Sequence, residues 1–330
     1  MAWHSRGMLL LALFPLNIHT GLSVTVRVLD EPATATELAA PAGLDTVHVA
    51  YASDSSGFTG LLASMLSLSR RLKDPQHCTI HLIVVKADMA KAESLLECFR
   101  SELTGQVPAV PKVVLHELQA VPFAYANIIK RLNICREQAI ARIYLHKYLP
   151  DIDRVLYLDF DTIVKDDIGS LYRMPMKHAF AAAVQSEETP THMYSKKFGP
   201  LVGLFKQPQA HTFNTGVLLM DLRRWRSENV TGSVEQWMQR TQVVEDQLLL
   251  NLAFQPGEGG YDEIGAEWNT CNLGCGAIRG PKTLSAAKIL HWSCMWKPWT
   301  KKYGNHANYK NYWEAPKACK AAEADLHISW

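Results

Sequence analysis

Two aspartates one residue apart are the first feature of the sequence that could do chemistry. Asp159 and Asp161 follow the apolar run 155–158, and a second apolar pair, 163–164, comes just after them. Side chains two residues apart point to the same side of an extended chain, so the carboxylates can converge. At the end of a buried strand they would repel each other and lose hydration. A hard divalent cation such as Mn²⁺ or Mg²⁺ removes both costs and leaves positions for phosphate oxygens.

The same pair also fits a simpler structure, a turn at the end of a strand in which the two side chains cap the following backbone amides. A D-x-D pair alone favours this turn. A metal-binding function is indicated only if other parts of the chain supply the remaining residues of a site.

Strand and helix patterns alternate around the pair, which predicts an α/β fold with a parallel sheet. Ligands of such sheets bind beyond the carboxyl ends of the strands, so the polar turn 52–57 is a candidate nucleotide contact. The chain has neither a dinucleotide fingerprint nor a P-loop. The expected strands are 46–52, 79–85 and 112–115, and the expected helices between them are 61–71 and 89–103.

The second half of the chain continues with both kinds of element around a long polar segment. Residues 185–212 contain Pro190, Pro200 and Pro208, and we expect an irregular loop there, of the kind that covers or binds a substrate. The expected helices are 136–149, 222–227, 231–240 and 245–253, the expected strands are 179–184, 287–290 and one within 212–222, and the tail 303–330 is a further candidate helix.

Composition and the N-terminus restrict the function class. A formal charge of +2 over 330 residues argues against a nucleic-acid-binding surface. Residues 1–23 have the layout of a secretory signal peptide or a short signal anchor, with a terminus packed on the fold as the alternative, and 24–44 resemble a stem. We therefore expect the secretory pathway, in the Golgi or ER lumen or outside the cell, with a membrane tether only through this first segment.

Seven cysteines fit an oxidising compartment, in which some would pair. Cys271 and Cys275 have a C-x3-C spacing without a second pair of cysteines or histidines at zinc-like spacing. They are interpreted as a loop disulfide or as packed thiols.

Several separate stretches together resemble one protein family, the family-8 retaining glycosyltransferases of GT-A fold. This group includes bacterial lipopolysaccharide galactosyltransferases, glycogenin and plant galacturonosyltransferase-like proteins. The stretches around Trp268-Asn269 and 291–299 are most similar to the plant branch. The resemblance covers roughly residues 46–300. The matching stretches are 139–145, 154–167, 213–226, Glu245-Asp246-Gln247, Trp268-Asn269 and 291–299.

The resemblance implies a GT-A domain over 45–330 that transfers a sugar from a UDP-sugar to a glycan or glycoconjugate, with retention at the anomeric carbon and with manganese. Asp159, Asp161 and His291 would be the metal ligands, which suits two carboxylates and one imidazole. Lys297 would reach the diphosphate. The other donor contacts implied are Arg142, Ala52 and Asp54, the last two bordering the uracil and ribose.

Three further residues match the part of the family that surrounds the transferred sugar. Asn214 would face the sugar, Asp246 would hold its hydroxyls, and Gln247 would lie opposite the leaving group. An amide is a poor nucleophile, which favours front-face displacement over a covalent intermediate on Gln247.

The chain departs from the family pattern at three positions. Cys294 stands where the family has the glycine of an HxxG loop, and Ala139 and Ile140 replace the usual threonine and tyrosine. Two other function classes stay open: a catalytically silent lumenal lectin or chaperone of the same fold, and a metal-dependent hydrolase or nucleotidyltransferase. Galactose, glucose, xylose and galacturonate are all possible donor sugars.

Overall fold

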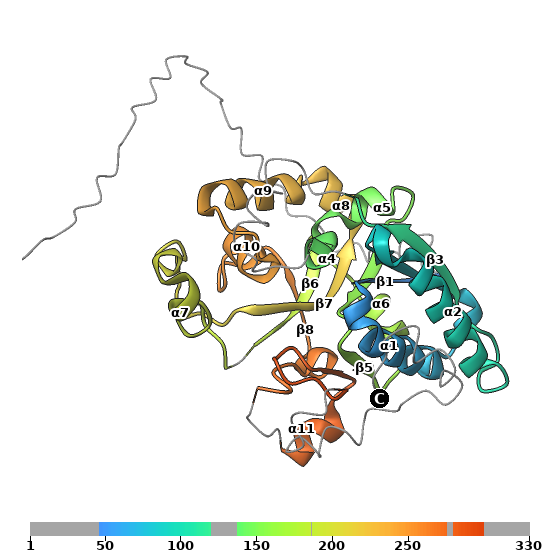
Figure 1. The fold of residues 1–330 in the computed structure, drawn as a ribbon. Coiled ribbons are helices and arrows are strands. Elements are labelled where there is room, and N and C mark those ends of the chain that lie inside the picture. Colours follow the sequence, from blue (N-terminus) through green and yellow to red (C-terminus); the bar gives the residue numbers. More distant parts are fainter. Residues whose placement is uncertain (1–45, 120–136, 186, 276–279, 300–330) are drawn as a thin grey trace, which may run out of the picture. The chain divides into compact units, whose positions relative to one another are not determined.

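The computed structural model describes residues 46–119, 137–185, 187–275 and 280–299. Within these residues the centre is a seven-stranded sheet in the order β3-β2-β1-β4-β7-β6-β8 (Figure 1). Its strands are β1 (Val47–Ser53), β2 (Cys78–Val84), β3 (Lys112–Glu117), β4 (Arg154–Leu158), β6 (Phe180–Val184), β7 (Phe213–Asp221) and β8 (Asp262–Ile264).

The sheet is mixed. β1, β2, β3 and β4 are parallel neighbours, which confirms the α/β prediction for this half. β7 runs antiparallel to both β4 and β6, so the alternation seen in the first half does not continue across the sheet. β7 pairs directly with β4, and both strands are buried along their whole length.

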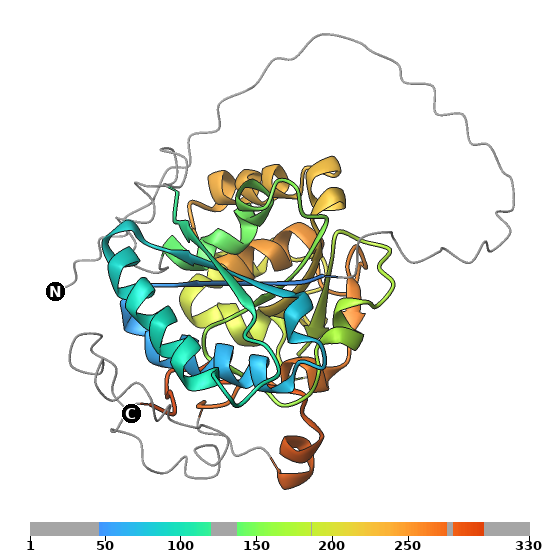
Figure 2. The same ribbon diagram turned by 90° about the vertical axis from the view of Figure 1, so that its right-hand side faces the viewer.

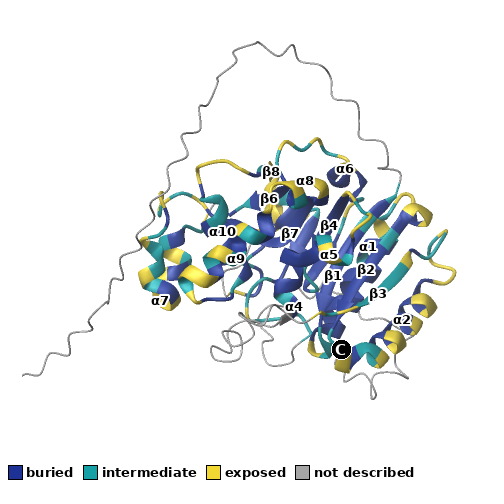
Figure 3. Cartoon of the chain, turned by 90° about the horizontal axis from the view of Figure 1, so that it is seen from above, coloured by how far each residue is buried: buried dark blue, intermediate teal, exposed yellow. Residues whose placement is uncertain are grey.

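Helices cover both faces of the sheet (Figure 2). Val49 and Tyr51 of β1 pack with α1 and α2, whereas Ala50 and Ala52 pack with the helices of the opposite face, because alternate residues of a strand point to opposite sides. Figure 3 shows the resulting layer of buried strands between partly exposed helices. The helices are α1 (Phe58–Arg71), α2 (Met89–Leu103), α4 (Glu137–Ile140), α5 (Leu145–Tyr148), α6 (Gly169–Tyr172), α7 (Pro190–Val202), α8 (Leu222–Ser227), α9 (Val230–Thr241), α10 (Asp246–Phe254) and α11 (Pro281–Ala286).

A second, two-stranded sheet joins distant parts of the chain. β5 (Thr162–Val164) pairs antiparallel with β9 (Ile289–His291), and Thr162 lies opposite His291. This pairing brings the end of the D-x-D stretch beside a histidine more than a hundred residues later.

The prediction of an irregular loop over 185–212 was wrong. The segment contains α7, which begins with Thr189 as N-cap, accepting from the His192 N–H, and with Pro190 in its first turn. The prolines of this segment suggested a loop instead of a helix. The backbone of α7 departs from helical angles at Phe198, two residues before Pro200. The helix is retained because Tyr194 and Phe198 are buried in one apolar cluster with Phe205, Val243, Leu248 and Leu252.

The expected single helix over 136–149 is divided. Residue 136 lies outside the described residues, and α4 and α5 are separated by the 3-10 turn Ala141–Tyr144. Arg142 lies in this turn, where its guanidinium is drawn to acceptors on β7 and at the end of β4.

The predicted signal segment 1–23, the stem 24–44 and the candidate tail helix 303–330 lie outside the described residues. None of the helices that the structure does describe has the length and apolar character needed to cross a membrane.

Candidate active site

Three side chains that could hold a metal ion converge at the carboxyl end of β4. Asp159 Oδ2 lies 3.6 Å and Asp161 Oδ1 lies 3.2 Å from Nε2 of His291. One ligand atom of each residue lies within 4.8 Å of the others. The carboxylates of Asp159 and Asp161 therefore form one cluster with the imidazole of His291, which lies far from them in the sequence.

The carboxylates converge through a turn and not through an extended strand as the spacing suggested. β4 ends at Leu158 and β5 begins at Thr162, with a turn at Phe160 and Asp161 between them. The hydroxyl of Thr162 donates to the Asp159 carbonyl at 2.9 Å. The Asp161 carbonyl accepts from the Trp292 N–H at 3.0 Å, which anchors the turn to the segment after β9.

A glycine on β7 leaves the space that this cluster surrounds. A Cβ atom at Gly216 would lie 2.1 Å from Cε1 of His291 and 2.7 Å from Oδ2 of Asp159. The Gly216 carbonyl also accepts from the Asp159 N–H at 2.8 Å, so the two backbones lie side by side. Any other residue at position 216 would fill the position between the imidazole and the carboxylate.

The donor set fits a divalent cation. Asp161 Oδ1 is buried, and apart from Nε2 of His291 at 3.2 Å it has no hydrogen-bond partner within the described residues, a costly state for a carboxylate oxygen. Two carboxylates and one imidazole are a suitable ligand set for Mn²⁺ or Mg²⁺. The buried oxygen, which faces only the His291 ring, and the space beside Gly216 both indicate a position for an ion.

Arg142 joins two of the acidic residues. Its Nη2 donates to Asp159 Oδ1 at 2.7 Å, and its Nη1 lies 3.1 Å from Asp246 Oδ2. Burial disfavours the charged guanidinium, but Asp159 and Asp246 outweigh this effect and raise the pKa of Arg142. The Thr215 hydroxyl completes the arrangement, donating to Asp246 at 2.8 Å and accepting from Arg142 at 3.2 Å.

The two predicted metal-binding aspartates have opposite pKa shifts. Burial raises the pKa of Asp159 above its ordinary value, and Asp161 adds to the rise, in spite of Arg142. Burial also opposes the ionisation of Asp161, but the nearby Lys297 outweighs it and the pKa of Asp161 is lowered. A bound cation would therefore favour the ionised form of both carboxylates.

Lys297 lies against the cluster. Its ammonium donates to Asp161 Oδ2 and to the Trp292 carbonyl. The loop that carries it is fixed by a disulfide between Cys275 and Cys294. The predicted alternative of a loop disulfide between Cys271 and Cys275 is therefore wrong. Cys271 remains a buried thiol, which accepts from Gln185 at 3.4 Å.

Asn214, Asp246 and Gln247 lie next to the cluster. Asn214 is buried, and its Nδ2 donates to Gln247 Oε1 at 3.0 Å. The same Gln247 oxygen accepts from the Thr215 N–H at 3.3 Å. Glu245 precedes them as the N-cap of α10, and burial together with Asp246 raises its pKa to about 7.

Ala52 and Asp54 lie at the end of β1, the strand beside β4. The side chain of Ala52 is buried in the apolar cluster that includes Ile140 and Ala141. Asp54 caps the 3-10 turn Ser55–Gly57, accepting from the Ser56 N–H at 3.0 Å, and accepts from Gln138. Both carboxylate oxygens of Asp54 thus have hydrogen-bond partners within the protein.

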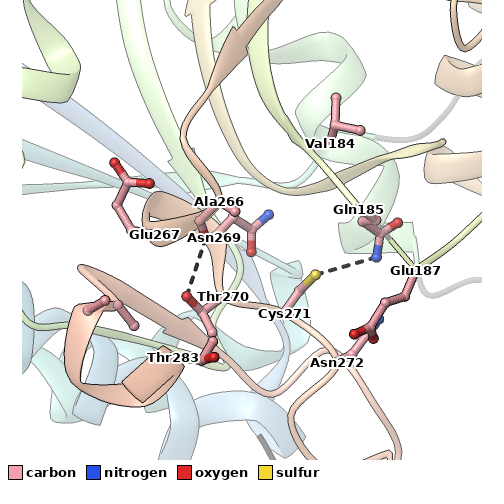
Figure 4. A pocket seen from close by; sticks show the side chains of 12 residues that line it. Val184, Gln185, Glu187, Ala266, Glu267, Asn269, Thr270, Cys271, Asn272 and Thr283 are labelled. Carbon is pink, nitrogen blue, oxygen red and sulfur yellow. Dashed lines mark hydrogen bonds between the residues drawn. The ribbon is translucent and has the colours of Figure 1, made fainter. Parts of the chain in front are cut away.

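A pocket of about 310 Å³ is lined in part by Asn269, which contacts His291, and by Gln185 (Figure 4). It is bounded by the end of β6, the 3-10 turn Ala266–Asn269 and α11. Its polar lining includes Gln185, Glu187, Asn269 and Asn272. Gln185 links the pocket to the cluster, because its Oε1 accepts from Gln247 Nε2 at 3.4 Å.

A mixed sheet with an acidic and histidine cluster at the end of its central strands is the architecture of GT-A glycosyltransferases, and solved structures of this class are similar. A galactosyltransferase LgtC in complex with donor and acceptor sugar analogs superimposes with a TM-score of 0.59 at 18% identity, over 81% of this chain and 95% of that chain. Mouse xyloside xylosyltransferase 1 gives a TM-score of 0.54 at 16% identity, over 76% of this chain and 98% of that chain. These likenesses establish the GT-A fold.

The sequence profile described as "Glycosyl transferase family 8" matches residues 48–303, and the chain belongs to this family of glycosyltransferases. Probable galacturonosyltransferase-like 9 of Arabidopsis thaliana is 30% identical over 275 residues, which cover 77% of this chain and 67% of that protein. Glycosyltransferase 8 domain-containing protein 1 of Xenopus laevis is 30% identical over 204 residues, which cover 54% of this chain and 55% of that protein.

Two residues of the site were not singled out from the sequence. Thr215 belongs to the matched stretch 213–226, and Asn269 belongs to the matched pair Trp268-Asn269, so each carried a signal without an assigned role. Their importance depends on contacts across the fold, which spacing along the chain does not report.

Proposed function

We propose that this glycosyltransferase transfers a sugar from a UDP-sugar to a glycan or glycoconjugate acceptor, with retention at the anomeric carbon and with Mn²⁺ or Mg²⁺ as cofactor. The observation that carries the proposal is the convergence of Asp159, Asp161 and His291 around the space left by Gly216. These three side chains would hold the ion. When bound, it would supply Lewis-acid stabilisation of the diphosphate leaving group.

The two cationic side chains near the site, Lys297 and Arg142, would have different roles. The ammonium group of Lys297 would move from Asp161 to the diphosphate. There, a point charge with three donors would offset the negative charge of the leaving group. Arg142 would hold Asp159 and Asp246 in place without touching the reacting atoms. Asp246 would then accept hydrogen bonds from hydroxyls of the transferred sugar.

The surroundings of Gln247 favour front-face displacement. The only Gln247 atom that could attack the anomeric carbon is Oε1, which already accepts from Asn214 and Thr215. In the proposed step the bond from the anomeric carbon to the diphosphate breaks, and the acceptor oxygen forms its bond on the same face. The acceptor hydroxyl proton passes to an oxygen of the departing phosphate.

The acceptor would enter from the pocket beside Gln185. Amide and carboxylate groups such as Gln185, Glu187 and Asn272 can hydrogen-bond the hydroxyls of a sugar. α7 would form the far wall of the approach, since Met193 accepts from Gln247 at 3.6 Å. The secretory pathway, with the Golgi or ER lumen as the compartment, remains part of this proposal.

A panel of UDP-galactose, UDP-glucose, UDP-xylose and UDP-galacturonate with Mn²⁺ tests the activity, with release of UDP as the readout. Asp161→Asn should abolish turnover, whereas Asp166→Asn, an exposed aspartate a few residues later, should not. Unchanged turnover in Asp161→Asn contradicts the proposal. Binding of UDP without turnover favours a silent sugar-binding protein, and tighter binding of nucleoside triphosphates than of UDP-sugars favours a hydrolase or nucleotidyltransferase.

A further inference from the structure

Two amide side chains connect the backbone of β7 to the ring of His291. The Gly216 N–H donates to Asn214 Oδ1 at 2.9 Å, and Asn269 Nδ2 donates to the same oxygen at 2.8 Å. Asn269 Oδ1 in turn lies 2.9 Å from His291 Nδ1. Asn214, Asn269 and His291 are each at most 5% exposed, so these contacts are shielded from water.

The orientation of every group in this chain follows from its first member. A backbone N–H can only donate, so the Asn214 atom that faces Gly216 is its carbonyl oxygen. That oxygen can only accept, so the Asn269 atom beside it is the NH₂ group. The Asn269 oxygen is then the atom that faces His291 Nδ1, and it too can only accept.

The ring of His291 is consequently held in one tautomer. In the neutral ring Nδ1 carries the hydrogen, so Nε2 has the lone pair that a metal ion requires. Nε2 points at Asp159 and Asp161, at 3.6 Å and 3.2 Å, so that only electron-pair donors face the centre of the cluster.

We infer that Asn269 is a positioning residue that fixes the Nδ1–H tautomer of His291 and so presents Nε2 to a divalent cation. Asn214 and the Gly216 N–H set the orientation of Asn269. The inference rests on the proposed metal site. It differs from the predicted role of Asn214 at the transferred sugar, because the Asn214 oxygen already accepts two hydrogen bonds and its NH₂ group already donates to Gln247.

Asn269 is the better position for a test. Asn214 contacts both Gln247 and Asn269, so its replacement would disturb both ends of the network. Asn269→Leu removes the acceptor for Nδ1 at similar size. Asn269→Asp keeps an acceptor there, in the carboxylate–histidine–metal arrangement common around metal sites. Thr270→Val is the matched control, because it removes only a neighbouring hydroxyl that donates to the Ala266 carbonyl at 3.3 Å.

The first readout is the tautomer of His291, measured by ¹⁵N NMR of histidine-labelled, metal-free protein at pH 8 and assigned with His291→Gln. The second is Mn²⁺ affinity without nucleotide, measured by electron paramagnetic resonance. We expect the Nδ1–H tautomer in the wild type and its loss in Asn269→Leu, with a Kd for Mn²⁺ raised about 10- to 100-fold. Asn269→Asp should keep the tautomer, although it loses the hydrogen bond to Asn214 Oδ1, and Thr270→Val should keep both the tautomer and a Kd within about threefold of the wild type.

A wild-type His291 that carries its hydrogen on Nε2 and none on Nδ1 overturns the inference, and so does an Asn269→Leu variant with unchanged tautomer and unchanged Mn²⁺ affinity. A wild type that shows the Nδ1–H tautomer, loses it in Asn269→Leu and yet binds no Mn²⁺ contradicts the proposed metal site while supporting the orienting role of Asn269. Circular dichroism melting checks the fold, and Asn269→Ala replaces Asn269→Leu if the larger side chain prevents folding.

Discussion

The guanidinium of Arg142 and the carboxylate of Asp159 form a hydrogen-bonded ion pair of 2.7 Å beneath the predicted metal site. The Arg142 side chain is 4% exposed, and its guanidinium also lies over the ring of Tyr157, 4.5 Å from the ring centre. The pair therefore sits at the junction between the apolar core under β4 and the acidic residues at the end of that strand. Its members come from a short helical turn and a strand end, which only the assembled sheet brings together.

Replacing Arg142 should destabilise the protein. Arg142→Met leaves Asp159 and Asp246 buried without their cation, and loss of one partner of a buried ion pair costs about 3–5 kcal/mol. Urea unfolding measures the change. Arg223→Met, on the exposed side of α8, should alter the free energy of unfolding by no more than about 0.5 kcal/mol. A loss below about 1 kcal/mol in Arg142→Met would show that the pair contributes little.

Adding a methyl group at Gly216 should block metal binding. The new Cβ of Gly216→Ala would collide with His291 and Asp159, so we expect the Kd for Mn²⁺ to rise at least about tenfold. Calorimetric titration provides the measurement. Gly199→Ala is the matched control, because a Cβ atom at that position has no described neighbour within 4 Å. Equal Mn²⁺ affinity in the two variants would exclude an ion at this position.

A row of histidines across β1, β2 and β3 should make stability depend on pH. His81 lies between His48 and His116, with nitrogen–nitrogen distances of 3.1 Å to each. Burial, followed by the neighbouring His48 and His116 and by Lys112, lowers the pKa of His81 to about 3. The unfolded chain, with an ordinary histidine pKa near 6.5, then binds the proton more readily than the folded protein. Stability from this site is therefore complete above about pH 6.5 and is lost as the pH falls toward 3.

Between pH 7 and pH 5 the His81 site should lower the free energy of unfolding by about 2 kcal/mol. Urea unfolding at the two pH values, in the wild type and in His81→Asn, isolates this share from that of other titrating groups. The exposed His211→Asn serves as the control and should keep the wild-type pH dependence. If His81→Asn loses as much stability on acidification as the wild type, the site does not contribute.

The Cys275–Cys294 disulfide should contribute to donor binding as well as to stability. It closes a loop with a sequence separation of 19 residues, and opening it by Cys275→Ser with Cys294→Ser should cost about 3 kcal/mol. Lys297 follows Cys294 by three residues. Without the disulfide, the double serine variant must order this loop when a diphosphate binds. Steady-state kinetics should show a raised KM for the UDP-sugar with a smaller change in kcat. The reverse pattern would place the effect on the chemical step.

The amino-acid sequence by itself determined the elements whose patterns are local. The helices 89–103 and 222–227 have the predicted bounds, because apolar spacing and polar flanks specify a helix before any tertiary contact forms. The parallel half of the sheet was predictable for the same reason. The D-x-D stretch, His291 and Lys297 could be chosen as site candidates, because residue types and spacing matched a family pattern.

Tertiary structure decided whatever depends on partners far apart in the chain. α7 exists because Tyr194 and Phe198 bury their rings against residues of α10, although its prolines predicted a loop. Cys294 pairs with Cys275 because the loop after β9 lies beside the loop that precedes α11, which the C-x3-C spacing did not reveal. The orientation of the His291 ring depends on a chain of hydrogen bonds that begins at the backbone N–H of Gly216. The donors and acceptors of this chain come together only when β7 and the loop that carries Asn269 have packed against each other.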